Sequence, residues 1–100
     1  MELEIIIAPS AQTELDKLLK KSDKEYIRIF TKRPSIYEDA TFNLELDSIK
    51  KEDMTFTVDG YKVIIDVNLA IQLESITISY GGLFSRDKFS VDADLGIFRY

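Results

Sequence analysis

The stretch Asp53-Met-Thr-Phe-Thr-Val-Asp59-Gly60-Tyr-Lys-Val-Ile-Ile-Asp66 decides the fold of this chain. Apolar and polar residues alternate on both sides of Asp59-Gly60, which is the period of a β-strand with one buried face. Asp-Gly between two such runs is a strong hairpin signal, because a type I′ turn needs positive φ at both central residues. The sequence therefore predicts a hairpin that turns at Asp59 and Gly60.

Similar patterns extend outward from this hairpin in both directions. Pro9 suits the first position of a helix, where its missing N–H has no partner to lose. The helix that follows has an apolar stripe made of Ala11, Leu15, Leu18 and Leu19. Further strands are predicted over residues 2–7, 26–30, 41–47, 76–80 and 89–91, with a short helical turn over 68–74. The pattern predicts a mostly β (α+β) fold of about seven short strands and one N-terminal helix.

Composition limits the chemistry that this chain can perform. The 100 residues contain no cysteine, no histidine and no tryptophan. Disulfides, thiolate nucleophiles, Ser-His-Asp triads and metal sites built on cysteine or histidine are therefore excluded. The 45% hydrophobic content fits one soluble domain over residues 1–100. We expect no enzyme.

Charge is unevenly distributed along the chain. The net charge is −5, yet residues 17–33 hold seven basic and two acidic side chains. The lysines of the predicted helix lie opposite its apolar stripe, and a solvated helix face explains them better than docking to an acidic partner. The overall acidic balance argues against nucleic-acid binding.

We expect neither a signal peptide nor a membrane span in the first residues. They are acidic, and the apolar run over residues 5–8 is far shorter than a bilayer requires. We expect a cytoplasmic protein that does not bind membranes.

The hairpin and several other segments resemble the HesB/IscA-like domain, the family of A-type iron–sulfur carriers. That family has an Asp, an aromatic residue, an acidic-Gly turn and alternating valines that end in Asp, as in residues 53–66. The other matching segments are Tyr26-Ile-Arg-Ile29, Leu73-Glu-Ser-Ile76-Thr-Ile78-Ser-Tyr80 and Phe89-Ser-Val91-Asp92-Ala-Asp94. The resemblance covers nearly the whole chain in order and implies a HesB-like domain with its strands in two small sheets.

The cluster ligands of that family are missing. The family carries a cysteine in a Gly-rich loop after the second strand and a Cys-Gly-Cys tail after the last one. Here the loop is residues 31–40, where the first cysteine would fall near Tyr37, and the tail is Leu95-Gly-Ile-Phe-Arg-Tyr100. The resemblance implies a cysteine-free, cofactor-free binding or regulatory module with a protein partner in iron–sulfur metabolism.

A carboxylate site is the alternative interpretation. Glu38 and Asp39 in the loop, and Asp92 and Asp94 before the tail, stand at the two places where the family's ligands would lie. Carboxylate oxygens are the ligands that hard cations prefer, so these acids predict a small metal-binding or catalytic site. A solvated loop and tail explain them better, and we therefore expect no bound metal.

Self-association is a further expectation. Residues 76–80 carry no charge and form a candidate edge strand, whose unpaired backbone groups must be blocked or paired. Ile97, Phe98 and Tyr100 add three large apolar side chains to a small domain. The sequence predicts a homodimer in which this C-terminal segment packs against the neighbouring subunit, the alternative being a monomer whose tail folds back.

Overall fold

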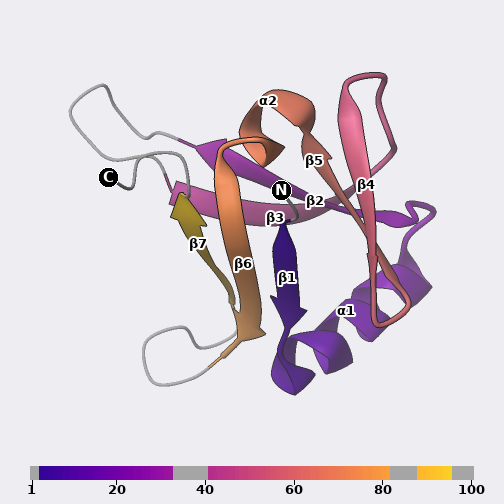
Figure 1. The fold of residues 1–100 in the computed structure, drawn as a ribbon. Coiled ribbons are helices and arrows are strands. Elements are labelled where there is room, and N and C mark those ends of the chain that lie inside the picture. The colour runs from indigo at the N-terminus through magenta and orange to yellow at the C-terminus, as the bar shows by residue number, and fades with distance from the viewer. Residues whose placement is uncertain (1–2, 33–40, 82–87, 96–100) are drawn as a thin grey trace.

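The computed structural model describes residues 3–32, 41–81 and 88–95, which Figure 1 draws as a coloured ribbon. Strands dominate this part of the chain, with one long helix near the N-terminus and one very short helix later. The elements in order are β1 (Glu4–Ile7), α1 (Pro9–Lys21), β2 (Tyr26–Lys32), β3 (Thr41–Asp47), β4 (Asp53–Val58), β5 (Tyr61–Asp66), α2 (Val67–Ala70), β6 (Leu73–Tyr80) and β7 (Phe89–Leu95).

The strands form two sheets. The smaller sheet has the order β1-β6-β7, in which β1 runs parallel to β6 and β7 runs antiparallel to it. The larger sheet has the order β3-β2-β5-β4, with a parallel central pair and antiparallel outer pairs. The predicted mostly β fold of about seven strands in two small sheets with one main helix is confirmed.

One apolar cluster joins the inner faces of both sheets to α1. Its fully or nearly fully buried members come from alternate strand positions and from one side of the helix. They include Ile5, Ile7, Ala11, Leu15, Ile27, Ile29, Val63, Ile65, Ile76 and Ile78. Burial of each large aliphatic side chain contributes about 1.5–3 kcal/mol, so this cluster supplies most of the favourable free energy of folding.

The centre of the larger sheet is buried on both faces. Ile64 points away from the core that Val63 and Ile65 face, and yet none of these three residues is exposed to solvent. On the outward side, which we call the back face, Ile64 is in register with Arg28 of β2. A strand buried on both sides is typical of the parallel centre of a sheet. Another part of the chain must therefore cover the back face here.

Helix α1 begins at Pro9, as predicted, and buries Ala11 and Leu15. The predicted apolar stripe is wrong at Leu18, whose side chain is 40% exposed. Leu19, the other predicted member near the end of the helix, is half-buried and does continue the stripe. At 3.6 residues per turn, Leu19 is rotated about 40° from Leu15, whereas Leu18 is rotated about 60° in the other direction. A pattern of spacings alone does not decide between these two positions.

The hairpin turn has the predicted backbone conformation. Val58 of β4 pairs with Tyr61 of β5, which leaves a two-residue turn of Asp59 and Gly60. Their φ angles are 52° and 88°, both positive as a type I′ turn requires.

Three further expectations need correction. The segment 76–80 is not an edge strand, because β6 lies between β1 and β7. The predicted helical turn over 68–74 is shorter, since α2 ends at Ala70 and β6 begins at Leu73. The last strand is longer than residues 89–91, because its pairing with β6 extends to Leu95.

Candidate functional site

The loop and the tail in which the family's ligands would lie both start from described strands at the same end of the fold. Residues 33–40 connect Lys32 of β2 to Thr41 of β3, which are paired. Strand β3 contacts β7, and Figure 1 shows the arrowhead of β7 beside the start of β3. Tyr37, Glu38 and Asp39, like Ile97, Phe98 and Tyr100, lie outside the described residues.

Asp92 and Asp94 belong to strand β7 and not to a tail. Both are exposed on the outer face of the smaller sheet, opposite Thr77 and Ser75. The hydroxyl of Ser75 donates to Asp94 Oδ2 at 3.1 Å. Within the described residues, no group of three or more histidine, cysteine or carboxylate side chains is placed to hold a metal ion. A site shared with Glu38 and Asp39 stays a prediction.

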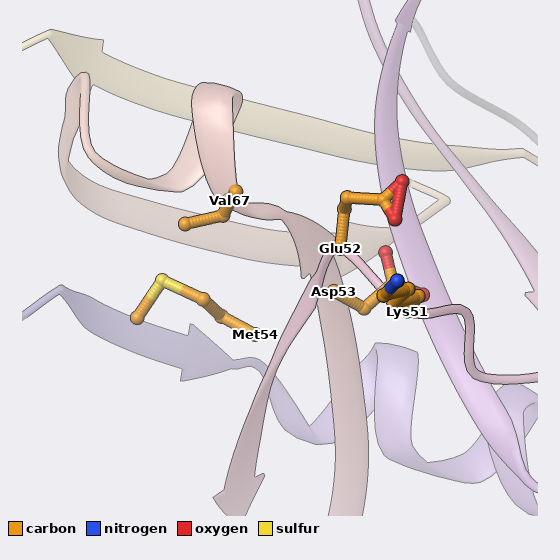
Figure 2. Close-up of a pocket in the computed structure, with 5 residues that line it drawn as sticks. All are labelled: Lys51, Glu52, Asp53, Met54 and Val67. Carbon is orange, nitrogen blue, oxygen red and sulfur yellow. The ribbon is translucent and has the colours of Figure 1, made fainter.

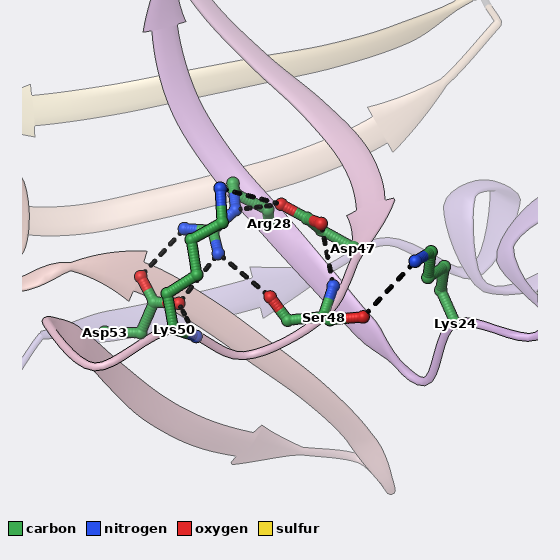
Figure 3. A network of polar contacts seen from close by, with 6 residues as sticks. All are labelled: Lys24, Arg28, Asp47, Ser48, Lys50 and Asp53. Atoms are coloured by element: carbon green, nitrogen blue, oxygen red, sulfur yellow. Dashed lines mark hydrogen bonds and ion pairs between the residues drawn. The ribbon is translucent and has the colours of Figure 1, made fainter.

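Arg28 is the centre of a polar network on the back face of the larger sheet (Figure 3). Its Nε donates to Asp47 Oδ2 at 2.6 Å. Its Nη1 and Nη2 donate to Asp53 Oδ1 and Oδ2 at 2.8 and 2.7 Å, and Nη2 also donates to the Ser48 carbonyl at 3.2 Å. The guanidinium therefore binds the last residue of β3, the first residue of β4 and the segment between them.

The strand order explains why the connection between β3 and β4 needs to be held in place. β3 and β4 are the two edge strands of the larger sheet, so the connection 48–52 must cross both central strands. Asp47 pairs with Tyr26 at the start of β2, and Asp53 pairs with Asp66 at the end of β5. The crossing is therefore diagonal. Arg28 rises from β2 between these two points and holds both ends of the crossing connection.

The charges of this network compensate one another. The side chain of Asp53 is only 2% exposed, and the hydrogen bonds from Arg28 hold the pKa of this carboxyl below its ordinary value. The hydrogen bond from Arg28 also lowers the pKa of the more exposed Asp47, and the bonds to Asp53 raise the pKa of Arg28 itself. The Lys50 and Ser48 amides donate to these same carboxylates at 2.7 and 2.8 Å. The network therefore links segments within the protein, and each nitrogen of the Arg28 guanidinium donates to at least one acceptor in it.

Arg28 is one of the seven basic residues of segment 17–33, but it does not contribute to an exposed basic surface. Only 8% of the residue is exposed, and its charge is compensated by Asp47 and Asp53. The sequence Tyr26-Ile-Arg-Ile-Phe30 does not reveal this role, because alternation only places Arg28 on the face opposite the two core isoleucines, and that face of a strand is commonly solvated. The exposed lysines of α1 remain a charged, solvent-facing helix surface, with Lys17 bound to Glu14 at 3.0 Å.

Two open hollows lie near the ends of the central strands. One, of about 600 Å³, is lined by Met54 and Val67 with Lys51, Glu52 and Asp53 beside them (Figure 2). The other, of about 350 Å³, lies between α2 and the end of β2, from which residues 33–40 continue. Its lining residues are Arg28, Ile29, Phe30, Thr31, Asp66, Asn68, Leu69 and Gln72.

Tyr61 ties the hairpin to helix α1. Its hydroxyl donates to Asp16 Oδ1 at 2.7 Å and lies 3.2 Å from the Gln12 carbonyl oxygen. The hydrogen bond to Asp16 raises the pKa of the Tyr61 phenol to about 12, because that bond exists only while the phenol keeps its proton. This contact orients secondary structure and is remote from both hollows.

No described helix is long and apolar enough to cross a membrane. Comparison with known sequences gives no family assignment, since neither a protein-family model nor a curated protein matches the chain.

Comparison with solved structures is informative. The crystal structure of Escherichia coli SufA, involved in biosynthesis of iron–sulfur clusters, matches with a TM-score of 0.70 and 16% identity, over 90% of this chain and 85% of that one. IscA with its 2Fe–2S cluster matches with a TM-score of 0.66 and 20% identity, over 91% of this chain and 84% of that one. The chain therefore has the HesB/IscA-like fold of the A-type iron–sulfur carriers, without a single cysteine in its sequence.

Proposed function

We propose that this protein is a non-enzymatic binding or regulatory module related to iron–sulfur cluster assembly. One observation carries the proposal: a fold shared with SufA and IscA is built by a sequence that contains neither cysteine nor histidine. Loss of the ligands removes the chemistry of a carrier and leaves its shape. A protein with the carrier fold that binds no iron–sulfur cluster can still be recognised by other proteins.

The cluster itself does not fit this chain. Iron–sulfur clusters are held by cysteine thiolates, with histidine as the occasional substitute. Because the whole sequence lacks both residues, assembly of several copies supplies no such ligand either. We accordingly derive no step in which this protein carries a cluster.

Reconstitution is the first experiment. The purified protein is incubated anaerobically with ferrous iron and sulfide and then separated by gel filtration, with a cysteine-bearing A-type carrier treated in parallel. We expect the cluster absorption bands on the carrier and none on this protein. A sulfide-to-iron charge-transfer band that stays with this protein would contradict the proposal.

Affinity capture is the second experiment. Immobilised full-length protein is incubated with native lysate of its own organism, and retained proteins are compared by mass spectrometry with those on beads carrying an unrelated acidic protein of similar size. We expect specific enrichment of proteins of iron–sulfur assembly. If only other proteins are enriched, the proposed relation of this protein to iron–sulfur cluster assembly is contradicted.

Two finer expectations belong to the same proposal. We place the protein in the cytoplasm, and we expect it to self-associate. The apolar residues Ile97, Phe98 and Tyr100 are one candidate contact for self-association, as the sequence suggests.

A further inference from the structure

The outer side of β4 is an open strand edge. β4 is hydrogen-bonded to β5 and has no second neighbour among the described strands, and Figure 1 shows it at the border of its sheet. In a two-residue hairpin the residues that flank the turn, Val58 and Tyr61, form a hydrogen-bonded pair. By alternation, the backbone groups of Thr55 and Thr57 point outward. No turn, loop or cap hydrogen bond in the described structure uses them.

This edge lacks the usual protection against strand pairing. Native edge strands are commonly blocked by charge, proline or a bulge. In β3 and β7 a charged residue lies inside the strand, Glu45 and Asp92, whereas the only charged residue of β4 is Asp53 at its first position. The segment 54–58 reads Met-Thr-Phe-Thr-Val, without charge or proline, and its register with β5 is continuous.

The side chains along this edge are sorted by type. Met54, Phe56 and Val58 share the inward side of the sheet; Met54 is 39% exposed and the other two are half-buried. Thr55 and Thr57 are exposed on the back face. The edge therefore offers an incompletely covered apolar strip beside two free amide and two free carbonyl groups.

In one antiparallel register, β4 of one copy can pair with β4 of a second copy. The Asp53 amide already donates to the Lys50 carbonyl at 3.1 Å, so Thr55 and Thr57 are the positions that remain for pairing. We propose that two copies of this chain associate through β4, antiparallel, around a two-fold axis at Phe56. Thr55 of each copy then lies opposite Thr57 of the other, which forms four backbone hydrogen bonds. Met54 lies opposite Val58, and Phe56 opposite its own copy.

The self-complementary pattern selects a second copy as the occupant. A two-fold axis at Phe56 pairs apolar with apolar and threonine with threonine along the whole segment 54–58. Beyond it, Asp53 faces Asp59, and the charge of Asp53 is compensated by Arg28. Because a single pair of short strands buries a small area, we expect a dissociation constant on the order of tens of micromolar.

Sedimentation analysis of the full chain from low to high micromolar concentration tests the association. Thr55→Pro removes one outward amide and no hydrogen bond to β5, and edge strands accept proline with this orientation. Thr55→Ala is the matched control, because it keeps the amide. We expect the unchanged protein and Thr55→Ala to dimerise alike and Thr55→Pro to weaken dimerisation at least about tenfold. Circular dichroism verifies that each variant is folded.

Single cysteines test the register, since the sequence contains none of its own. In the proposed dimer the Cα atoms at position 56 form a non-hydrogen-bonded pair about 4.5 Å apart, which a disulfide spans. Two residues at position 54 are separated by about 13 Å along the strands. Mild oxidation should therefore cross-link Phe56→Cys rapidly and the matched Met54→Cys slowly.

The outcomes that overturn the proposal are distinct. One is a full chain that stays monomeric at several hundred micromolar, as expected if β4 accepts only a segment of another protein. Another is equal dimerisation of Thr55→Pro and Thr55→Ala. A dimer abolished by Phe98→Asp and unaffected by Thr55→Pro assigns association to the C-terminal segment instead. A monomeric full chain would also overturn the expected self-association, but reconstitution and affinity capture do not depend on these results, so the proposed binding or regulatory role would stand.

Discussion

Arg28 and Asp53 are joined by two parallel hydrogen bonds of 2.8 and 2.7 Å, although they are 25 residues apart in the sequence. This bidentate geometry is specific to a guanidinium facing a carboxylate. It connects a central strand of the larger sheet to the edge strand β4, at the residue where the connection 48–52 ends. The pair therefore defines where that connection ends.

Removal of Arg28 is predicted to be strongly destabilising. Arg28→Met leaves the Asp53 carboxylate buried without a cation, which should lower the free energy of unfolding by about 3–5 kcal/mol. Urea unfolding followed by circular dichroism measures this loss. The double variant Arg28→Met/Asp53→Leu is the control, and it should be more stable than the sum of the two single effects predicts. Additive effects would mean that the two side chains are not coupled.

Acid should weaken the wild-type protein more than the Arg28→Met variant. The folded-state pKa values of Asp53 and Asp47 lie below their ordinary values, so their contribution is present above about pH 4 and is lost as the pH falls through the folded values. The difference in unfolding free energy between wild type and Arg28→Met should therefore shrink below about pH 4. Urea titrations at a series of acidic pH values measure it, and a constant difference contradicts the prediction.

A substitution at the hairpin tests backbone strain without a steric clash. No atom lies within 4 Å of a Cβ placed at Gly60, whose φ of 88° is unfavourable for any other residue. Gly60→Val should cost about 1–2 kcal/mol, because a β-branched residue resists positive φ. The control Asp59→Asn, at a position that tolerates asparagine, should leave the melting temperature nearly unchanged. An unchanged melting temperature in Gly60→Val would exclude backbone strain at this turn.

Tyr61 predicts a loss of stability at alkaline pH, as the two aspartates do at acidic pH. Its folded-state pKa of about 12 lies above the ordinary value, so its stabilising effect is complete below about pH 10 and is lost as the pH rises toward 12. Tyr61→Phe should cost about 0.5–1.5 kcal/mol at neutral pH. The phenolate absorbance of the wild type should include one late-titrating tyrosine that is absent from Tyr61→Phe. A titration curve that merely loses an ordinary tyrosine would refute the assignment.

Local chemistry made most of the fold predictable. Asp59-Gly60 specifies its turn by backbone conformation alone, and alternation specifies which face of each strand is buried. Leu18 was misassigned because two helical positions at similar angles to Leu15 differ only through what packs nearby. The segment 76–80 was misassigned as an edge because pairing with β1 and β7 depends on topology and not on the charge of the strand itself.

The candidate site was less predictable, for a related reason. Asp92 and Asp94 were expected near a loop and tail, whereas they lie in strand β7, which directs them to the outer face of the smaller sheet. The Arg28 network depends on a crossing connection whose path is fixed by the order of four strands. A sequence pattern reports what one segment prefers, whereas this network exists only where three segments meet.

The pairing of β1 with β6 has a consequence for how the protein acquires its structure. Ile5 pairs with Ile76, so the smaller sheet joins the beginning of the chain to its last third. During synthesis β1 has no strand partner until β6 emerges from the ribosome, whereas the β4–β5 hairpin can close on its own. Closing so long a loop costs conformational entropy, and we therefore expect the smaller sheet to form last. Pulsed hydrogen exchange during refolding should protect the amides of β5 before those of β1, and the reverse order would exclude this sequence of events.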